Sequence, residues 1–330
     1  CGFEQSELSR TPYDWNGVER ELGLFYLDRT EKPVLKAMTA FSEFVEALPF
    51  RRMPKRMTDA VCVLTRGQDA WAAAYGAFIL ARQAHVGLTF AWADGPIPEA
   101  PAYLLPSVIG DTPMNRSVYL KLIDRVKQGA KLYLSLDGAL LSPFSAFSGL
   151  RVLTRAHAPQ TAEVSFQGET IRMQRDYRLR CESIGAEVLA STPNGDVAFA
   201  RNRCGEGEVY TLLFPLEHQM ACQPGMTDSE DAQPGFLFYE AMNLRSREKA
   251  VSVSQPTLGL TEHQVDDRQH IVTVINYEPY DQQALLTLAE GWTVVECRSM
   301  EDAAQLHGST LHLPHNNGAV LTVAYAEPQP

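Results

Sequence analysis

The stretch TDAVCVLTRGQDAW, residues 58–71, contains a strand pattern followed shortly by a helix start. Residues 60–64 are all apolar, which is typical of a short strand that is buried on both faces. Asp69 comes next, and its carboxylate can cap a helix that is predicted to run through Trp71 to Arg82. A buried strand followed by a helix is the repeating unit of a parallel α/β sheet.

The same alternation continues along the chain. Further strands are predicted at residues 86–90, 102–105 and 131–135. Pro106 is expected to end the second of these, and a helix opened by Thr112 and Pro113 and closed by Gly129 precedes the third. The fold class predicted for residues 58–248 is therefore α/β, with a doubly wound, flavodoxin-like sheet.

The pattern changes after residue 149 to strands and turns. Hairpin turns are predicted at residues 167–168 and 193–196, and one more helix is predicted at residues 235–247. Residues 251–330 hold only short strands separated by turns, which indicates a small C-terminal β-sandwich.

The first fifty residues carry one helix pattern. Thr30 is expected to cap this helix, Pro33 lies in its first turn, and Pro49 stops it. Apolar side chains at three- and four-residue steps form one stripe: Leu35, Met38, Phe41, Val45 and Leu48. A segment this short cannot bury such a stripe by itself, so we expect it to dock on a larger body. The start at Cys1, without an initiator Met or a signal-peptide layout, suggests a fragment.

Composition narrows the function classes. The 330 residues are 45% hydrophobic and 21% charged, which is ordinary for a globular protein, and no apolar run is long enough to span a membrane. A net charge of −11 argues against nucleic acid as a partner. The six cysteines show no CxxC spacing, which suits a reducing cytoplasm better than a disulfide scaffold or a zinc site. Cys62 is expected to be a buried packing residue.

The α/β region lacks an obvious nucleophile. An enzyme of this type places one on the turn after a central strand, but residues 136–139, which follow the strand at 131–135, contain neither Cys nor Ser. The histidines do not cluster, so no metal and no cofactor are expected. Glu217 and His218 are adjacent in the sequence, and we interpret them as a polar contact carried by a loop.

Glu4 and Glu7 are the one pair of carboxylates near several aromatic residues. Glycosidases use two carboxyl groups, with aromatic rings as platforms for sugars. The spacing permits such a pair but does not specify one, and a surface loop is the favoured interpretation.

Several strings of residues resemble the family-42 β-galactosidases, which are multidomain glycoside hydrolases. The end of a (β/α)₈ barrel is suggested by YDWNGVERELGL (13–24) and TEKPVLKA (30–37). The amidotransferase-like trimerisation domain of these enzymes is suggested by AYLLPS (102–107), QGAKLYLS (128–135), GEGEVY (205–210) and FPLE (214–217). The tail, with VIN (274–276) and GW (291–292), is similar to their small β-domain.

This resemblance implies three parts: the last loop and helix of a barrel at residues 1–50, an amidotransferase-like domain at 58–248, and a β-sandwich at 251–330. In the family the catalytic glutamates follow barrel strands four and seven, so no catalytic residue is expected in this chain. Too little chain separates Glu4 from the last helix for it to be the strand-seven nucleophile. The expected substrate-binding residues, at the rim of a sugar cleft, are Glu4, Tyr13, Asp14 and Trp15.

The resemblance leads to one main hypothesis and two alternatives. The chain would be the C-terminal region of a glycosidase acting on β-linked sugars, inactive alone, with a missing barrel segment or second chain as partner and a homo-oligomer, such as a trimer, as its assembly. The first alternative is a stand-alone oligomerisation or binding module. The second is a degenerate amidotransferase-like enzyme with a reactive thiol at Cys62 or Cys181.

Overall fold

The computed structural model describes residues 23–26, 28–109, 114–223 and 232–326, and its largest sheet has seven strands in mixed pairing. Its strands, in spatial order, are β3 (Leu88–Trp92), β2 (Ala60–Leu64), β4 (Ala102–Val108), β5 (Lys131–Leu136), β10 (Gly207–Leu212), β9 (Val197–Cys204) and β8 (Glu187–Ser191). The strands from β3 to β10 are parallel, whereas β9 and β8 extend the sheet in antiparallel pairing. The region is therefore α/β, as predicted.

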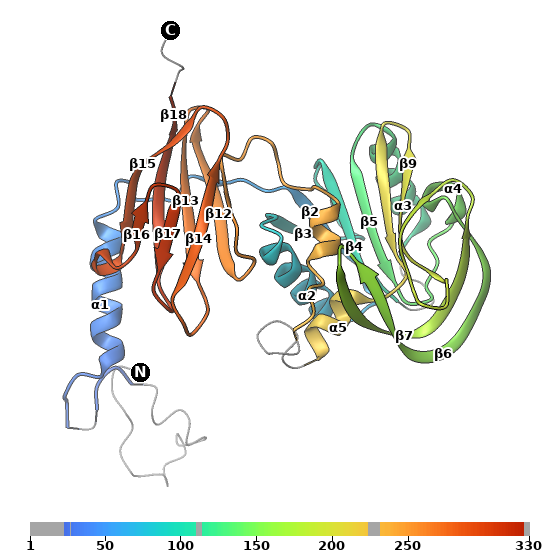
Figure 1. The fold of residues 1–330 in the computed structure, drawn as a ribbon, viewed down its shortest axis with the longest axis horizontal. Helices are drawn as coiled ribbons and strands as arrows, with labels where there is room; N and C mark the ends of the chain where they lie inside the picture. Colours follow the sequence, from blue (N-terminus) through green and yellow to red (C-terminus); the bar gives the residue numbers. More distant parts are fainter. Residues whose placement is uncertain (1–22, 27, 110–113, 224–231, 327–330) are drawn as a thin grey trace. The chain divides into compact units, whose positions relative to one another are not determined.

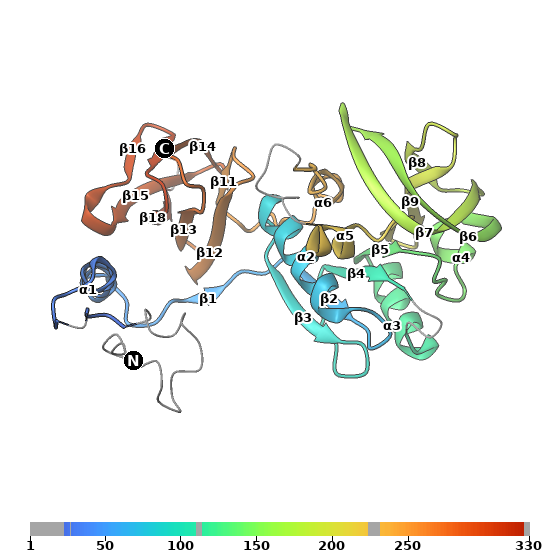
Figure 2. The same cartoon turned by 90° about the horizontal axis from the view of Figure 1, so that it is seen from below.

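Two helices cover opposite faces of this sheet (Figures 1 and 2). Helix α2 (Ala70–Gln83) packs into one apolar cluster with β2 and β4, and α3 (Arg116–Lys127) packs into a second cluster formed by the alternate residues of the same strands. The strand order reverses between β2 and β4, so the helices that follow these strands lie on different faces. This is the doubly wound arrangement, in which ligands bind outside the carboxyl ends of the strands.

Local signals in the sequence were right at the start of one helix and wrong at the end of one strand. Asp69 caps α2, since its carboxylate accepts the N–H of Ala72 at 3.0 Å. Pro106 does not end β4, which continues to Val108 with an irregular register against β5. The Pro106 carbonyl accepts the Nε2–H of Gln68 at 2.7 Å, so this carbonyl has a partner where the register is irregular. Thr112 and Pro113 lie outside the described residues, and Asn115 caps α3.

The rest of residues 57–262, which form one compact unit, consists mainly of a long hairpin and short helices. Strands β6 (Leu150–Phe166) and β7 (Glu169–Ser183) pair antiparallel around the predicted turn at residues 167–168. The short helices are α4 (Ser145–Ser148), α5 (Leu216–Cys222) and α6 (Leu237–Ala241), and strand β11 (Val251–Val253) follows them. The helix predicted at 235–247 is therefore too long. The backbone reverses to a positive φ of 47° at Asn243, and Lys131 Nζ donates to the Met242 and Asn243 carbonyls at 2.7 and 3.0 Å.

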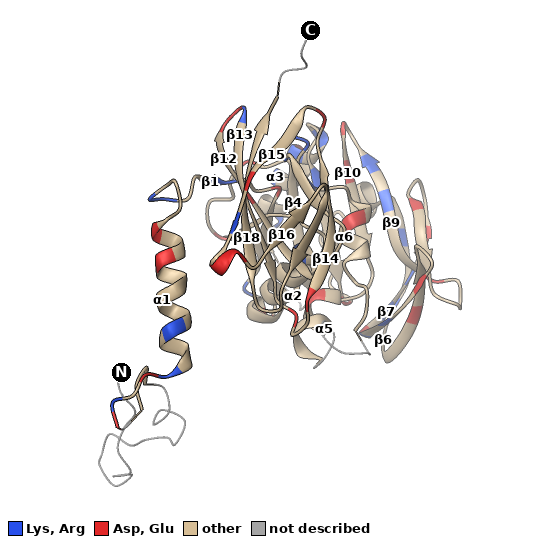
Figure 3. Ribbon diagram, turned by 60° about the vertical axis from the view of Figure 1, so that its left-hand side comes forward, with Lys and Arg blue, Asp and Glu red and all other residues tan. Residues whose placement is uncertain are grey.

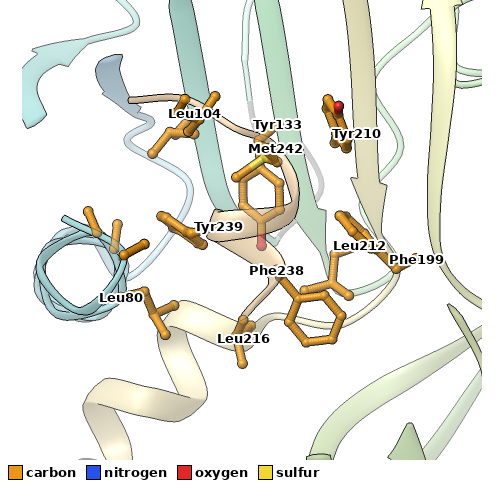
Figure 4. Close-up of a cluster of buried hydrophobic side chains, with 14 of the residues drawn as sticks. Leu80, Leu104, Tyr133, Phe199, Tyr210, Leu212, Leu216, Phe238, Tyr239 and Met242 are labelled. Carbon is orange, nitrogen blue, oxygen red and sulfur yellow. The ribbon is translucent and has the colours of Figure 1, made fainter. Parts of the chain in front are cut away.

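The core between α2, α5 and the sheet is rich in aromatic rings (Figure 4). Phe166 stacks on Phe238 with ring centres 4.9 Å apart, and Phe199 meets Phe238 edge-on at 5.1 Å. Cys62 lies in this core with no exposed surface, as predicted. Gly76 of α2 allows a very close approach to α5, since a Cβ there would lie 2.0 Å from the Glu217 backbone oxygen.

The chain forms two compact units, residues 57–262 and the segments on either side of them. The second unit contains α1 (Pro33–Glu46) and antiparallel strands. One sheet orders β1 (Lys55–Arg56), β12 (Leu258–Asp266), β13 (Gln269–Asn276), β18 (Gly318–Tyr325) and β15 (Trp292–Ser299). The other strands are β14 (Gln282–Leu288), β17 (Thr310–Leu313) and β16 (Gln305–His307), with a 3₁₀ turn η2 (Met300–Asp302).

The start of α1 differs from the prediction. Its N-cap residue is Lys32, which makes no side-chain cap. Thr30 instead donates its hydroxyl and its N–H to Asp28 Oδ1, at 2.6 and 2.9 Å, in a turn before the helix. Over the part of the chain that the structure describes, no helix is long and apolar enough to cross a membrane.

Candidate functional site

The apolar stripe of α1 is largely exposed. None of the helix residues is buried, and Met38 and Phe41 keep 52% and 59% of their surface open. Val45 is also exposed, whereas Leu35 and Leu48 are half-buried. The charged residues of this helix lie near its ends, with an uncharged stretch between them (Figure 3). The described chain therefore covers this stripe only in part. That residues 1–50 dock on a larger body stays a prediction.

The inner side of α1 rests loosely on its own unit. A cavity of about 370 Å³ lies between the helix and strands β13 and β18, and Phe41, Val45 and Leu48 of the stripe line it together with Phe44 and Ile275, so part of the stripe faces this unit's own strands. One polar tie holds the helix end, where Arg298 Nη1 donates to the Ala47 carbonyl at 2.9 Å. A gap of this size shows that the helix is only partly packed.

A buried carboxylate marks the carboxyl edge of the parallel sheet in the other unit. Glu217 has no exposed surface and accepts four hydroxyl hydrogen bonds. Tyr133 and Tyr239 donate to Oε1 at 2.8 and 3.0 Å, and Ser107 donates to Oε2 at 2.8 Å, where Ser135 also donates. The donors come from β4, β5 and α6, so one carboxylate connects three elements to α5.

This network is structural. Burial, together with the nearby Glu217 carboxylate, raises the pKa of both Tyr133 and Tyr239 well above the ordinary value, so their hydroxyls stay protonated as donors. Buried polar groups that are fully hydrogen-bonded stabilise a unique packing. Glu217 and His218 lie on helix α5 and not on a loop, which corrects the sequence interpretation, and Glu217 points inward because the helix turns by about 100° per residue.

Ser107 has the backbone of a sharp strand end, with a φ of 45° near the end of β4. A nucleophile elbow uses such a strained turn to expose its hydroxyl. Here the Ser107 side chain is buried, since its Oγ donates to Glu217 and accepts the backbone N–H of His218 at 2.9 Å. The turn therefore binds the network together and presents no open nucleophile. The positive φ at Ser107 falls where the register of β4 against β5 is irregular, and the sequence contains no sign of it.

A small polar cavity of about 190 Å³ lies in front of this network. Its lining comes from the carboxyl ends of strands, from β7 and from α5: Ile109, Asp137, Gln174, Arg175, Asp176, Pro215, His218, Gln219, Cys222 and Gln223. Asp137 accepts the backbone N–H groups of Asp176 and Tyr177 at 2.9 and 2.8 Å, and burial raises the pKa of its carboxyl. His218 Nε2 lies 3.7 Å from Cys222 Sγ.

Neither of the two thiols considered in the amidotransferase hypothesis is activated. Burial raises the pKa of Cys62 far above its ordinary value, and burial raises that of Cys181 to about 11. Reactive cysteines instead have a lowered pKa in an electropositive, accessible place. The described residues also contain no group of three or more His, Cys, Asp or Glu side chains that could hold a metal ion.

The residues predicted to bind sugar, Glu4, Tyr13, Asp14 and Trp15, lie outside the described residues, as does Glu7. Their role remains a prediction. Sequence reasoning missed Ser107 and Arg175, and no local pattern separates either from an ordinary strand residue.

Comparison with known proteins defines the fold but not the activity. No protein-family model and no curated protein sequence matches the chain. Among solved structures, a β-galactosidase from Rahnella sp. R3 matches 97% of this chain with a TM-score of 0.66 and 12% identity. A catalytic mutant of Gan42B, a GH42 β-galactosidase from G. stearothermophilus, matches 98% with a TM-score of 0.60 and 12% identity. The chain has the fold of about half of such an enzyme.

The match is partial on the enzyme side. It covers 48% and 47% of the two β-galactosidases, so the chain spans about half of their length. An exo-β-1,4-mannosidase, Op5Man5 from Opitutaceae bacterium strain TAV5, matches 74% of this chain and 46% of its own length, with 18% identity and a TM-score of 0.57. The likeness to glycoside hydrolases, and to family-42 β-galactosidases in particular, is thus a likeness of fold.

Proposed function

We propose that this chain is a non-catalytic region of a glycoside hydrolase that acts on β-linked sugars in the manner of a β-galactosidase. The observation that carries this proposal is the exposed apolar face of α1, in a chain whose fold accounts for about half of a GH42 β-galactosidase. In this proposal the face of α1 packs on a catalytic (β/α)₈ barrel, as the last helix of that barrel.

The arrangement at the carboxyl edge of the sheet supports a non-catalytic role for the α/β unit. Glycoside hydrolysis needs two carboxyl groups on either side of a scissile bond, with room for a sugar on each side of it. The small cavity contains Asp137 and Asp176, but Asp137 is bound to two backbone N–H groups, and a volume of about 190 Å³ is below the range of roughly 300–1,000 Å³ of ligand pockets that hold larger molecules.

The second part of the proposal is that the α/β unit, an amidotransferase-like domain without the activity, mediates contacts in a homo-oligomer such as a trimer. A row of aromatic side chains on α2 supports this. Trp71 is 66% exposed and stacks on Tyr75 with ring centres 5.3 Å apart, and Phe78 lies one turn further on. Exposed aromatic residues are enriched in protein interfaces. The described cysteines are all free, which favours a cytoplasmic location.

The test is turnover of nitrophenyl β-glycosides by the 330-residue chain. We expect none. The coding sequence upstream of residue 1 is expected to encode the rest of a barrel, which typically has about 250 residues in total, with two glutamates at its strand ends. Robust turnover by the chain alone would refute the proposal, and so would an upstream sequence without strand–helix alternation.

A further inference from the structure

Asn317 and Gly318 form an Asn-Gly pair in which the asparagine side chain lies against the next peptide group. The backbone N–H of Gly318 donates to Asn317 Oδ1 at 2.7 Å. The side-chain carbonyl carbon, Cγ, is one C=O bond of about 1.23 Å away from that oxygen, so Cγ is also close to the nitrogen. These are the two atoms that join when an asparagine side chain cyclises onto the main chain, and reactions between groups already held close together are fast.

The main chain of this pair is held by strand β13. Asn276 donates its backbone N–H to the Asn317 carbonyl at 2.8 Å, and Ile275 pairs with Gly318 where β18 begins. Both residues of the pair are only half-buried, and both line the cavity between α1 and strands β13 and β18. The fold thus fixes the position of the nitrogen and leaves the side-chain amide within reach of water.

A second Asn-Gly pair, Asn194 and Gly195, has the same two residue types in a different setting. It is exposed, in the turn between β8 and β9. There the Gly195 N–H donates to the Thr192 carbonyl at 2.9 Å, so the turn directs this nitrogen to a backbone carbonyl instead of the asparagine side chain. Exposure alone would make Asn194 the more reactive of the two. Geometry favours Asn317, because a misplacement of about 1 Å can slow a reaction between positioned groups by about 10²-fold.

We infer that Asn317 is a site of spontaneous deamidation in the folded chain, with water as the co-reactant. The Gly318 nitrogen gives up its proton and attacks Asn317 Cγ, so that an N–Cγ bond forms and the Cγ–Nδ2 bond breaks. Nδ2 takes up the proton and leaves as ammonia, and a five-membered succinimide ring remains. Water then adds to one of the two ring carbonyls and opens the ring, which leaves aspartate or isoaspartate at position 317.

The product changes the wall of the cavity beside α1. Either form places a carboxylate where Asn317 lines the cavity together with Phe41, Val45 and Leu48. Isoaspartate also lengthens the main chain by one carbon directly before β18, because the chain then runs through the side-chain carbonyl. The inference does not depend on the proposed function, since it concerns a reaction between atoms of this chain and water.

The test compares the two Asn-Gly pairs within one sample. The full chain is incubated at mildly alkaline pH, once in buffer and once unfolded in guanidinium chloride, and is then digested. Mass spectrometry follows the gain in mass of each peptide, and chromatography separates the isoaspartate form. We expect Asn317 to deamidate at least about ten-fold faster than Asn194 in the folded chain. In guanidinium chloride the two rates should become similar, because neither backbone geometry survives unfolding.

Variants then assign the reacting residue. Asn317→Gln keeps a side-chain amide but would have to close a six-membered ring, so the mass gain of this peptide should stop. The matched control is Asn194→Gln, which should leave the rate at Asn317 unchanged. A mass gain that persists in Asn317→Gln would place the reaction on the neighbouring Asn316 and overturn the inference. A rate at Asn317 that does not exceed the rate at Asn194 in the folded parent chain would also overturn it, and so would a ratio of rates that persists in guanidinium chloride; neither result depends on a variant that folds.

Discussion

Helices α1 and α2 each have 14 residues, yet they differ in how they are packed. Helix α2 buries Ala72, Ala73, Gly76, Ala77, Leu80 and Ala81, whereas α1 buries none of its residues. Small residues let α2 approach α5 closely, while the large apolar side chains of α1 are only partly covered, because a cavity separates Phe41 and Val45 from strands β13 and β18. An amphipathic pattern thus predicts that a helix docks, but it does not say which molecule covers it.

The largest effect on stability is expected from removing the Glu217 carboxylate, which lies on α5 against α2. Glu217→Ala deprives four hydroxyl donors of their acceptor, and each unpaired buried donor costs about 1–3 kcal/mol. We expect a loss of at least about 4 kcal/mol in the free energy of unfolding, measured by urea denaturation. Glu43→Ala on the exposed face of α1 is the control and should change this free energy little. Equal effects of the two substitutions would contradict a structural role for the network.

A smaller loss is expected from Leu80→Ala. Leu80 is fully buried in α2, and removing such a side chain costs about 2–5 kcal/mol because a cavity remains. The matched substitution on the other helix, Leu35→Ala, should cost less than about 1 kcal/mol, since Leu35 is only half-buried. Urea midpoints of the two variants, measured side by side, give the comparison. A larger loss for Leu35→Ala would mean that α1 is packed in solution.

The free energy of unfolding should also depend on pH, because of a histidine at the end of α2. His85, just after the helix, has a pKa lowered to about 4, mainly by burial and further by Arg245 and Arg82, although it contacts the Gln255 carbonyl at 3.1 Å. Its ordinary pKa is 6.5, so the unfolded chain binds the proton more readily. The stability contributed by neutral His85 is present above pH 6.5 and is lost as the pH falls towards 4.

The free energy of unfolding is expected to fall by at most about 3 kcal/mol over this pH range. Solvent screening makes the fall smaller, because the His85 ring is only half-buried. Urea denaturation of the parent chain and of His85→Gln, at several pH values between 7 and 4, measures it. The variant should lose this part of the pH dependence, and His307→Gln, at an exposed position, should keep it. A pH profile unchanged in His85→Gln would exclude the residue as the titrating group.

The smallest change in the free energy of unfolding is expected from a substitution in the exposed stripe of α1. Phe41→Ser removes a large apolar side chain that is 59% exposed, so the free energy of unfolding of the isolated chain should change by no more than about 0.5 kcal/mol. The variant should also associate less with itself in light scattering, since an exposed apolar patch has been removed. A loss of several kcal/mol would show that the chain buries this face by itself.

The sequence predicted the elements that depend on local patterns. The apolar run at residues 60–64 and the carboxylate of Asp69 were enough for β2 and the start of α2, because each signal acts within a few residues. Pro106 misled the prediction of β4, because its ring removes one N–H but an irregular register and a contact from Gln68 let the strand continue.

Features that depend on distant residues were not predictable. Glu217 is bound by groups up to 110 positions away, and Arg175 contacts Asp196 and Phe214, which lie in segments between other elements. A single sequence does not show which distant residues come into contact in the fold. The expected sugar-binding residues near the N-terminus remain a prediction, because they lie outside the described residues.

Hydrogen–deuterium exchange of the 330-residue chain tests the comparison of the two helices most directly. Backbone amides in a helix exchange through local opening, and opening is easier where few apolar contacts hold the helix. We predict that amides of α1 exchange much faster than those of α2 in the chain alone. Equal protection of α1 and α2 would contradict the claim that the apolar face of α1 awaits a partner.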